Sequence, residues 1–296
     1  SLLFTYPGIS LGAMVSLSEN SLNIRGVSHY YEWIGGGYDS RKPVMVFIHG
    51  WAGSARYWQR TATALSAQFN CLLYDLRGFG RSKLPEAPIH LSYELEEYAE
   101  DLALLLDGLG LESVYINSHS MGASIAVFFL TKYGERVKKA ILTCSGIFEY
   151  NALAFAAFYQ FGGYVVKFRY PWFLKVPGSD RAFMARFLYR PIPAPERRAF
   201  LVDFLEADYE AALGTIYTSV SKKAVEIMPQ EFATIGVPTL LISGEKDQII
   251  PAIMGKQAAS LNPQIQYIEM SKTGHFPMLE DEETYLRVVR EFLNQD

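Results

Sequence analysis

Near the middle of the chain, one serine stands where a nucleophile would be expected. Ser120 lies in the segment Ser118-His119-Ser120-Met121-Gly122, between an apolar run at 114–116 and a run of small residues at 123–126. A serine hydroxyl is a poor nucleophile until a base removes its proton, so it must project clear of a sheet to meet that base. A strand, a sharp turn and a helix with serine at the apex indicate a nucleophile elbow.

The residues two positions before and two positions after this serine must be small, because the end of the strand and the start of the helix approach each other closely there. Gly122 meets this need, whereas Ser118 on the other flank adds a Cβ and a hydroxyl. We expect the Ser118 hydroxyl to bond to nearby backbone.

A base for Ser120 must come from the five histidines of the chain. His119 is next to the serine on a strained turn, so we expect its side chain to point away from the hydroxyl. His49 ends a buried strand, His29 lies in an early hairpin and His90 in a loop with prolines. His275 remains, in a loop between the strand-like run at 265–268 and a C-terminal helix, from which an imidazole can reach across the top of a sheet.

The base needs a carboxylate that fixes its tautomer and stabilises the imidazolium. Asp247 follows the strand-like run at 239–242, at the carboxyl end where catalytic loops of a parallel sheet gather. Glu245 and Glu149 are the competing carboxylates.

The rest of the chain predicts an α/β fold that can present such loops. Strand-like runs alternate with helical patterns, which is typical of a parallel sheet covered on both faces. A helix is expected over 93–109, and an antiparallel hairpin arm over 24–33, ending at the turn 35–37, should form the sheet edge. The predicted strands are 44–48, 71–74, 114–116, 140–143 and 239–242.

The alternation of strand-like runs and helical patterns stops after residue 143. Residues 147–232 are helical, aromatic and interrupted by prolines, which predicts a cap inserted into a core formed by 1–146 and 233–296. Most cap rings must pack against each other, but some should face Ser120, with Phe155 and Tyr159 as candidates for substrate binding. The cap arginines are expected to be solvated, although one could bind a substrate carboxylate.

Several segments together resemble the α/β-hydrolase superfamily, in its serine hydrolase branch with a helical cap. The order Ser120, Asp247, His275 matches this family, and so do His49-Gly50-Trp51 and the segment 75–82, Asp-Leu-Arg-Gly-Phe-Gly-Arg-Ser. The resemblance covers nearly the whole chain. The family usually has glycine where this chain has Ser118. Its dehalogenase and epoxide-hydrolase branches carry aspartate at the elbow, so Ser120 argues against both branches.

The resemblance also implies an oxyanion hole formed by the backbone N–H groups of Trp51 and Met121. The Trp51 ring is a candidate for the substrate pocket, with simple packing as the alternative. The segment Asp75-Leu76-Arg77-Gly78 is interpreted as structural, holding loops together through hydrogen bonds and an ion pair.

These observations predict a metal-independent and cofactor-independent serine hydrolase acting on esters of small to medium apolar acids. Three alternatives stay open: a meta-cleavage-type carbon–carbon bond hydrolase, which would need an arginine aimed at the substrate carboxylate; a perhydrolase-like enzyme; and a non-catalytic protein that binds a small apolar ligand.

Composition excludes some partners. A net charge of -4 in 296 residues, with scattered basic residues, argues against nucleic acid. Cys71 and Cys144 lie in apolar runs without metal spacing, so a reducing compartment and a cytoplasmic location are expected. The first residues lack the pattern of a signal peptide, no transmembrane helix is expected, and the oligomeric state is open. An exposed apolar face of the cap could dock on a membrane surface or a partner.

Overall fold

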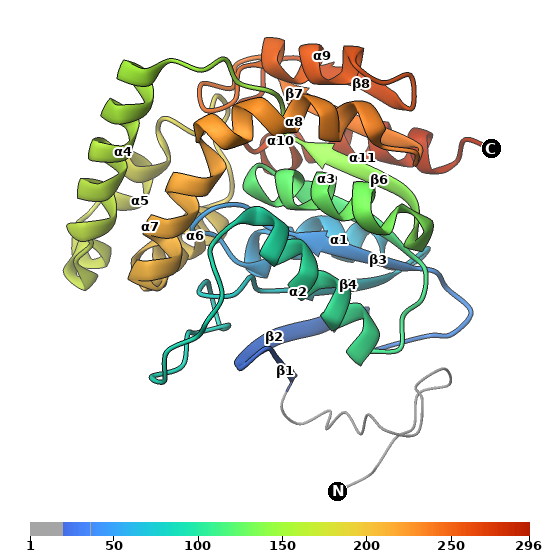
Figure 1. Cartoon of the computed structure of the whole chain (residues 1–296), viewed down its shortest axis with the longest axis horizontal. Helices are drawn as coiled ribbons and strands as arrows, with labels where there is room; N and C mark the ends of the chain where they lie inside the picture. Colours follow the sequence, from blue (N-terminus) through green and yellow to red (C-terminus); the bar gives the residue numbers. More distant parts are fainter. Residues whose placement is uncertain (1–19, 36) are drawn as a thin grey trace, which may run out of the picture.

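A mostly parallel sheet of eight strands forms the centre of the protein (Figure 1). The structure, a computed structural model, describes residues 20–35 and 37–296, so the predictions for the N-terminal segment and for Gly36 lie outside the described residues. The strands are β1 (Ser21–Ile24), β2 (Val27–Ile34), β3 (Val44–Ile48), β4 (Asn70–Tyr74), β5 (Val114–His119), β6 (Val137–Thr143), β7 (Thr239–Gly244) and β8 (Ile265–Met270).

Strand order confirms the predicted α/β architecture. The order is β1-β2-β4-β3-β5-β6-β7-β8, with antiparallel pairing only for β1 with β2 and β2 with β4. The antiparallel hairpin therefore forms one edge, as expected.

Alternating side chains of the strands feed two apolar layers, one on each face of the sheet. In β3, Val44, Val46 and Ile48 belong to one buried cluster, while Met45 and Phe47 belong to the other. Burial on both faces explains why this strand is a continuous apolar run. The first layer is covered by α2 (Leu95–Gly108), α3 (Met121–Tyr133) and α9 (Ala252–Ser260), and the second by α1 (Gln59–Leu65) and α11 (Glu282–Leu293).

A group of helices is inserted between β6 and β7. Figure 1 shows α4 to α7 gathered at one side of the sheet, at left, while α8 runs back over the sheet. These elements are α4 (Ala152–Lys167), the 3-10 turn η3 (Pro171–Lys175), α5 (Ser179–Met184), α6 (Ala194–Glu206), α7 (Tyr209–Ser219) and α8 (Lys222–Thr234). The predicted domain boundary at residue 232 falls inside α8, where Met228 and Phe232 join the first core cluster.

One buried carboxylate ties this helical insertion to the core. Asp203 of α6 accepts a hydrogen bond of 2.7 Å from the Ser54 hydroxyl and pairs with the Arg56 guanidinium. Burial raises the pKa of Asp203 to about 6, outweighing both of these partners. The contact joins α6 to the loop that precedes α1.

Two further expectations concern cysteines and membrane spans. Cys71 lies in β4 and Cys144 directly after β6, and both are free and buried. Across the residues that the structure describes, none of the helices has the length and apolar character needed to cross a bilayer.

Candidate active site

Ser120 occupies a sharp turn between β5 and α3. Its φ of 56° and ψ of -121° place a non-glycine residue at positive φ, a strained conformation that persists where the surrounding structure enforces it. A Cβ on Gly122 would lie 2.3 Å from the carbonyl oxygen of His49, so only glycine fits there. The turn thus has the shape that the sequence predicted for an elbow.

Ser118 is accommodated through its hydroxyl. The side chain is fully buried, and its Oγ–H donates to the carbonyl oxygen of Ile141 at 2.8 Å. Ile141 lies in the neighbouring strand β6, so the hydroxyl links β5 to β6 immediately before the turn.

Removing this hydroxyl should lower stability without changing the site. We expect Ser118→Ala to reduce the free energy of unfolding by about 1 kcal/mol, because the Ile141 carbonyl loses a buried donor. Ser118→Gly should cost about 0.5–1 kcal/mol more, because glycine loses more backbone entropy in a strand. Urea unfolding measures both changes. A Ser118→Gly protein that is more stable than the parent would contradict this interpretation.

The structure brings together the three side chains proposed as a catalytic set. His275 Nε2 lies 2.9 Å from Ser120 Oγ, and His275 Nδ1 lies 2.8 Å from Asp247 Oδ2. The His275 and Asp247 side chains are both buried. This geometry lets Nδ1–H donate to the carboxylate while Nε2 accepts the serine proton.

Backbone donors hold the Asp247 carboxylate in place. Its Oδ1 accepts the N–H groups of Ile249 and Ile250 at 2.8 and 3.1 Å. Burial raises the pKa of Asp247, but the charge and hydrogen bond of His275, together with these two N–H groups, outweigh burial and lower it. The competing Glu245 instead accepts the N–H of Lys272 at 3.0 Å, in an exposed contact.

The loop that carries His275 is fastened to the helical insertion. The N–H of His275 donates to the carbonyl oxygen of Phe187 at 2.7 Å, and the Phe187 ring lies 6.1 Å from the imidazole. Neither contact was foreseen from the sequence, because Phe187 is far from His275 along the chain and carries no motif.

Glu280, in α10 (Pro277–Glu280), strengthens the same junction. This buried carboxylate accepts the N–H groups of Tyr189 and Arg190 at 2.7 and 2.8 Å, and those of Gly274 and Phe276 at 2.9 and 3.0 Å. The residues on both sides of His275 are therefore bonded to the same carboxylate as the cap segment at 189–190.

The two backbone donors predicted for an oxyanion hole flank the serine. Met121 is the first residue of α3, so its N–H has no carbonyl partner within that helix. Trp51 follows Gly50, where a Cβ would lie 3.1 Å from the Cβ of Ser120. The Trp51 ring packs on Phe204, and its Nε1–H donates to the carbonyl oxygen of Ala212 at 2.8 Å, so it connects this loop to the cap.

A buried hydrogen-bond chain joins the Gly50 loop to the histidine loop. The N–H of Gly50 donates to the Tyr57 hydroxyl at 2.5 Å, and that hydroxyl lies 2.8 Å from His119 Nδ1. His119 Nε2 is 2.6 Å from the carbonyl oxygen of His275, which can only accept, so Nε2 carries the proton and Tyr57 donates to Nδ1.

His119 and Tyr57, the two side chains of this hydrogen-bond chain, keep their neutral forms. Burial, and then the charge of His275, holds the pKa of His119 well below its usual range. Burial also raises the pKa of Tyr57 well above that of a free phenol. His119 points away from the Ser120 hydroxyl, as expected, but Tyr57 is a site residue that the sequence did not single out.

Phe155 and Tyr159, the proposed substrate-binding rings, lie on α4 and face other cap residues. Phe155 is buried against Tyr150, and Tyr159 packs on the Tyr217 ring of α7. The Tyr159 hydroxyl also donates to the carbonyl oxygen of Val220. Their contacts hold α4 against α7.

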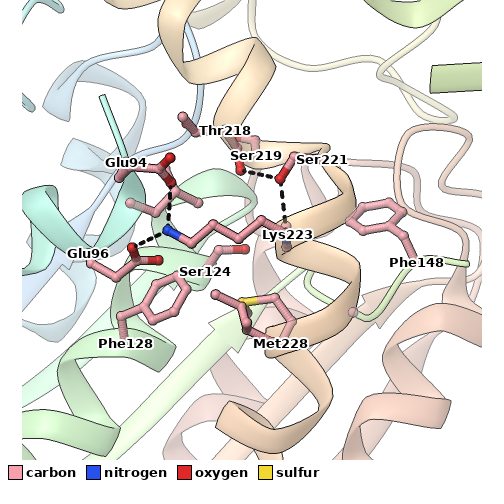
Figure 2. Close-up of a pocket in the computed structure, with 14 residues that line it drawn as sticks. Glu94, Glu96, Ser124, Phe128, Phe148, Thr218, Ser219, Ser221, Lys223 and Met228 are labelled. Atoms are coloured by element: carbon pink, nitrogen blue, oxygen red, sulfur yellow. Dashed lines mark hydrogen bonds and ion pairs between the residues drawn. The ribbon is translucent and has the colours of Figure 1, made fainter. Parts of the chain in front are cut away.

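A pocket lies one helical turn beyond Ser120 along α3. It is a small hollow, open to solvent, between Ser124 and Phe128 of α3 and the start of α8 (Figure 2). Phe148 and Met228 add apolar wall. At its rim, Lys223 Nζ contacts the carboxylates of Glu94 and Glu96 at 3.2 and 2.9 Å.

The segment that follows β4 forms ion pairs and loop contacts. Asp75 pairs with Arg81 at 2.8 Å and accepts the N–H of Ala55, while the fully buried Arg77 pairs with Asp101 at 2.9 Å. These contacts agree with the structural interpretation of this segment.

One group of side chains near the site has metal-ligand chemistry. The potential ligand atoms of His119, Cys144 and His275 lie within 4.8 Å of one another. However, both nitrogens of each histidine already take part in the hydrogen bonds described above, and burial raises the pKa of the Cys144 thiol well above its usual value. This arrangement suits hydrogen bonding rather than metal coordination.

Comparison with known proteins assigns the family. The chain belongs to the α/β hydrolase fold family, whose sequence profile matches residues 43–282. It is 27% identical over 278 residues to the AB hydrolase superfamily protein YisY of Bacillus subtilis (strain 168), covering 90% of this chain and 96% of that protein. Lipase 1 of Psychrobacter immobilis is 28% identical over 254 residues, which cover 80% of this chain and 72% of the lipase.

Solved structures agree on the fold. A hydrolase from Pseudomonas aeruginosa PA01 superposes with a TM-score of 0.76, covering 94% of this chain and all of that one (100%) at 19% identity. At this level of identity the match supports the shared architecture alone.

Proposed function

We propose that this protein is a serine hydrolase that cleaves carboxylic esters of small to medium apolar acids through an acyl-enzyme intermediate. The observation that carries the proposal is the continuous line from Asp247 through His275 to Ser120, with separations of 2.8 and 2.9 Å. The similarity to a lipase supports ester chemistry.

In the proposed mechanism, His275 Nε2 takes the proton as Ser120 Oγ attacks the ester carbonyl carbon. The N–H groups of Met121 and Trp51 stabilise the oxyanion, and Asp247 stabilises the imidazolium. His275 then protonates the leaving alcohol, the acyl group stays on Ser120, and water activated by His275 releases the acid. Apart from the substrate and this water, the proposed steps use side chains and backbone of this chain.

The proposed substrate class rests on the inserted helices and on the apolar residues of the pocket beside α3. We propose that residues 147–232 act as a cap that limits access of water. We further propose that the apolar residues Phe128, Phe148 and Met228, in the pocket that includes Ser124, accommodate the acyl group. We retain Trp51, Phe155 and Tyr159 as candidates for the remaining wall.

Arginine contacts favour ester hydrolysis over carbon–carbon bond cleavage. Of the six cap arginines, Arg169 is bonded to the carbonyl oxygens of Val166, Phe204 and Ala207, and Arg197 pairs with Asp180. Arg190 and Arg198 bond to other carbonyls, and Arg181 and Arg186 are exposed. A meta-cleavage substrate would need a cap or core arginine aimed at its carboxylate, and four of the six cap arginines are bonded to other groups.

Labelling with a fluorophosphonate probe tests the proposal. We expect the probe to modify Ser120, as mapped by peptide mass spectrometry, and to leave Ser120→Ala unlabelled. Absence of labelling in the parent would instead support a non-catalytic ligand-binding protein. An ester series graded by acyl length then defines the substrate, and turnover restricted to vinylogous diketones or to peracid formation would refute the ester assignment.

Tyr57 provides a second test, directed at the Gly50 loop. Tyr57→Phe keeps the ring but removes the hydroxyl that accepts the Gly50 N–H and donates to His119. We expect kcat for ester hydrolysis to fall about 10- to 100-fold with little change in KM, because a displaced oxyanion donor affects the transition state more than substrate binding. Steady-state kinetics measure the split between kcat and KM.

Tyr74→Phe is the matched control for this substitution. The Tyr74 hydroxyl is equally buried but has no hydrogen-bond partner among the described residues. Its removal should leave kcat unchanged. Equal kinetic effects of the two substitutions would show that Tyr57 contributes only to packing.

A further inference from the structure

Helix α4 is apolar on two opposite faces, and only one of them is packed. Phe155, Gly162 and Val166 recur at helical spacing on the buried face. The opposite face carries Leu153, Ala157, Phe161, Tyr164 and Phe168, which also recur at helical spacing and are all exposed. Leu153 is 84% exposed and Phe161 is 68% exposed. A helix with apolar residues all round is normally buried on all sides or placed against lipid.

Exposed aromatic side chains continue along the sequence beyond the end of the helix. Tyr164 and Phe168 stack, with ring centroids 6.1 Å apart, and the Tyr170 and Trp172 rings stack in the same way at 6.1 Å. Trp172 is 57% exposed. Figure 1 places α4 at the outer edge of the cap, away from the sheet. We call the residues Leu153, Phe161, Tyr164, Phe168, Tyr170 and Trp172 the α4 face.

In the sequence segment that contains the α4 face, basic residues outnumber acidic ones, although the whole protein has a net negative charge. Residues 150–190 contain six Lys and Arg and a single acidic residue, Asp180, whereas the chain as a whole has 27 basic and 31 acidic residues. Lys167 lies between the two residues of the first stacked pair in sequence, and Lys175 follows the second pair. Both lysines are exposed and form no salt bridge with any residue that the structure describes. Lys167 Nζ lies 5.6 Å from the centroid of the Phe168 ring.

We propose that the α4 face docks on the surface of an anionic phospholipid bilayer. Exposed aromatic and aliphatic side chains enter the boundary between headgroups and acyl chains, where Trp and Tyr are favoured. Nearby lysines and arginines add attraction to the anionic headgroups. Because α4 has only 16 residues, it lies along the surface and does not cross the bilayer.

Charge also distinguishes this partner from a second copy of the chain. In a two-fold dimer the same patch meets itself, so the excess of lysines and arginines in both copies would be brought together. Such like-charge contacts are unfavourable when they lose solvent. An anionic lipid surface buries the same apolar face and neutralises those charges.

Vesicle flotation of the full chain tests the proposal, with Ser120→Ala as the parent so that hydrolysis does not alter the lipid. We expect the parent to bind vesicles of phosphatidylcholine with phosphatidylglycerol, to bind pure phosphatidylcholine more weakly, and to dissociate as salt is raised. The double variant F161S/W172S should lower the partition coefficient by at least about tenfold, because two large apolar side chains no longer enter the interface.

Charge reversal and a control complete the design. The variant K167E/K175E should lower binding to the anionic vesicles by about tenfold or more, at roughly 1 kcal/mol per lysine removed from the surface. The variant I253S/L261S removes two exposed apolar residues of and beside α9 and should bind as the parent does. Circular dichroism confirms that each variant is folded.

Three outcomes would overturn the proposal: no binding of the parent to anionic vesicles, undiminished binding of both α4-face variants, or a parent that is dimeric by light scattering and becomes monomeric as F161S/W172S. The last outcome would assign the face to self-association. Flotation measures binding without catalysis, so its failure leaves the proposed hydrolase function to be judged separately by fluorophosphonate labelling at Ser120.

Discussion

His275→Gln should lower kcat for ester hydrolysis by about 10⁶-fold, the largest loss expected for any residue outside the nucleophile. The imidazole Nε2 lies 2.9 Å from Ser120 Oγ and is the group placed to accept its proton. Glutamine has a similar reach but cannot act as a base near neutral pH. Active-site titration together with steady-state kinetics would separate a true loss of kcat from loss of folded protein.

His90→Gln is the matched control. It makes the same chemical change at an exposed histidine in the loop before α2. It should keep the kcat of the parent. Activity of His275→Gln within a hundredfold of the parent would place the base on another residue.

Asp247→Asn should lower kcat by about 10⁴-fold with the overall structure intact. The backbone N–H groups of Ile249 and Ile250 already occupy Oδ1, so the amide nitrogen of asparagine would face His275 Nδ1 and donate to it. The imidazole proton would then sit on Nε2, where it prevents uptake of the serine proton. Kinetics at several pH values, with KM measured alongside kcat, test this tautomer argument.

Stability provides an independent readout for the same variant. Because the pKa of Asp247 is lowered in the folded protein, its ionised form stabilises the fold above the ordinary carboxyl range, and this contribution is lost as pH falls through the lowered value. Asp247→Asn should remove that part of the acid dependence in urea unfolding. Glu245→Gln, at the exposed neighbouring carboxylate, is the control and should leave kcat unchanged.

The sequence was sufficient to predict the sheet because it depends on local patterns, and such patterns also supplied the three triad candidates that the structure brings together. Continuous apolar runs indicated the buried parallel strands, and the order of serine, aspartate and histidine matched a known family. The one imperfect position, Ser118, also followed the expectation that its hydroxyl would bond to backbone, although the acceptor lies on the neighbouring strand and not within the turn.

Long-range contacts were not predictable in the same way. Tyr57 resembles any core aromatic until the fold brings its hydroxyl between Gly50 and His119. Glu280 resembles a surface acid of a short helix, yet it is buried among four N–H donors. For α4, the sequence is apolar on all sides, so periodicity could not show which rings face outward.

The shared bonding of Glu280 has a consequence for how substrate enters. Its carboxylate holds cap residues 189–190 and the backbone on both sides of His275 at once, and Phe187 adds a further bond to His275 itself. A motion that lifts this corner of the cap must either break these hydrogen bonds or withdraw the imidazole from Ser120, and in the second case the proposed mechanism would stop while the cap is open. Under the proposed mechanism, substrate entry that keeps these bonds and the imidazole in place requires motion at another edge of the cap, with residues 187–190 as its fixed pivot.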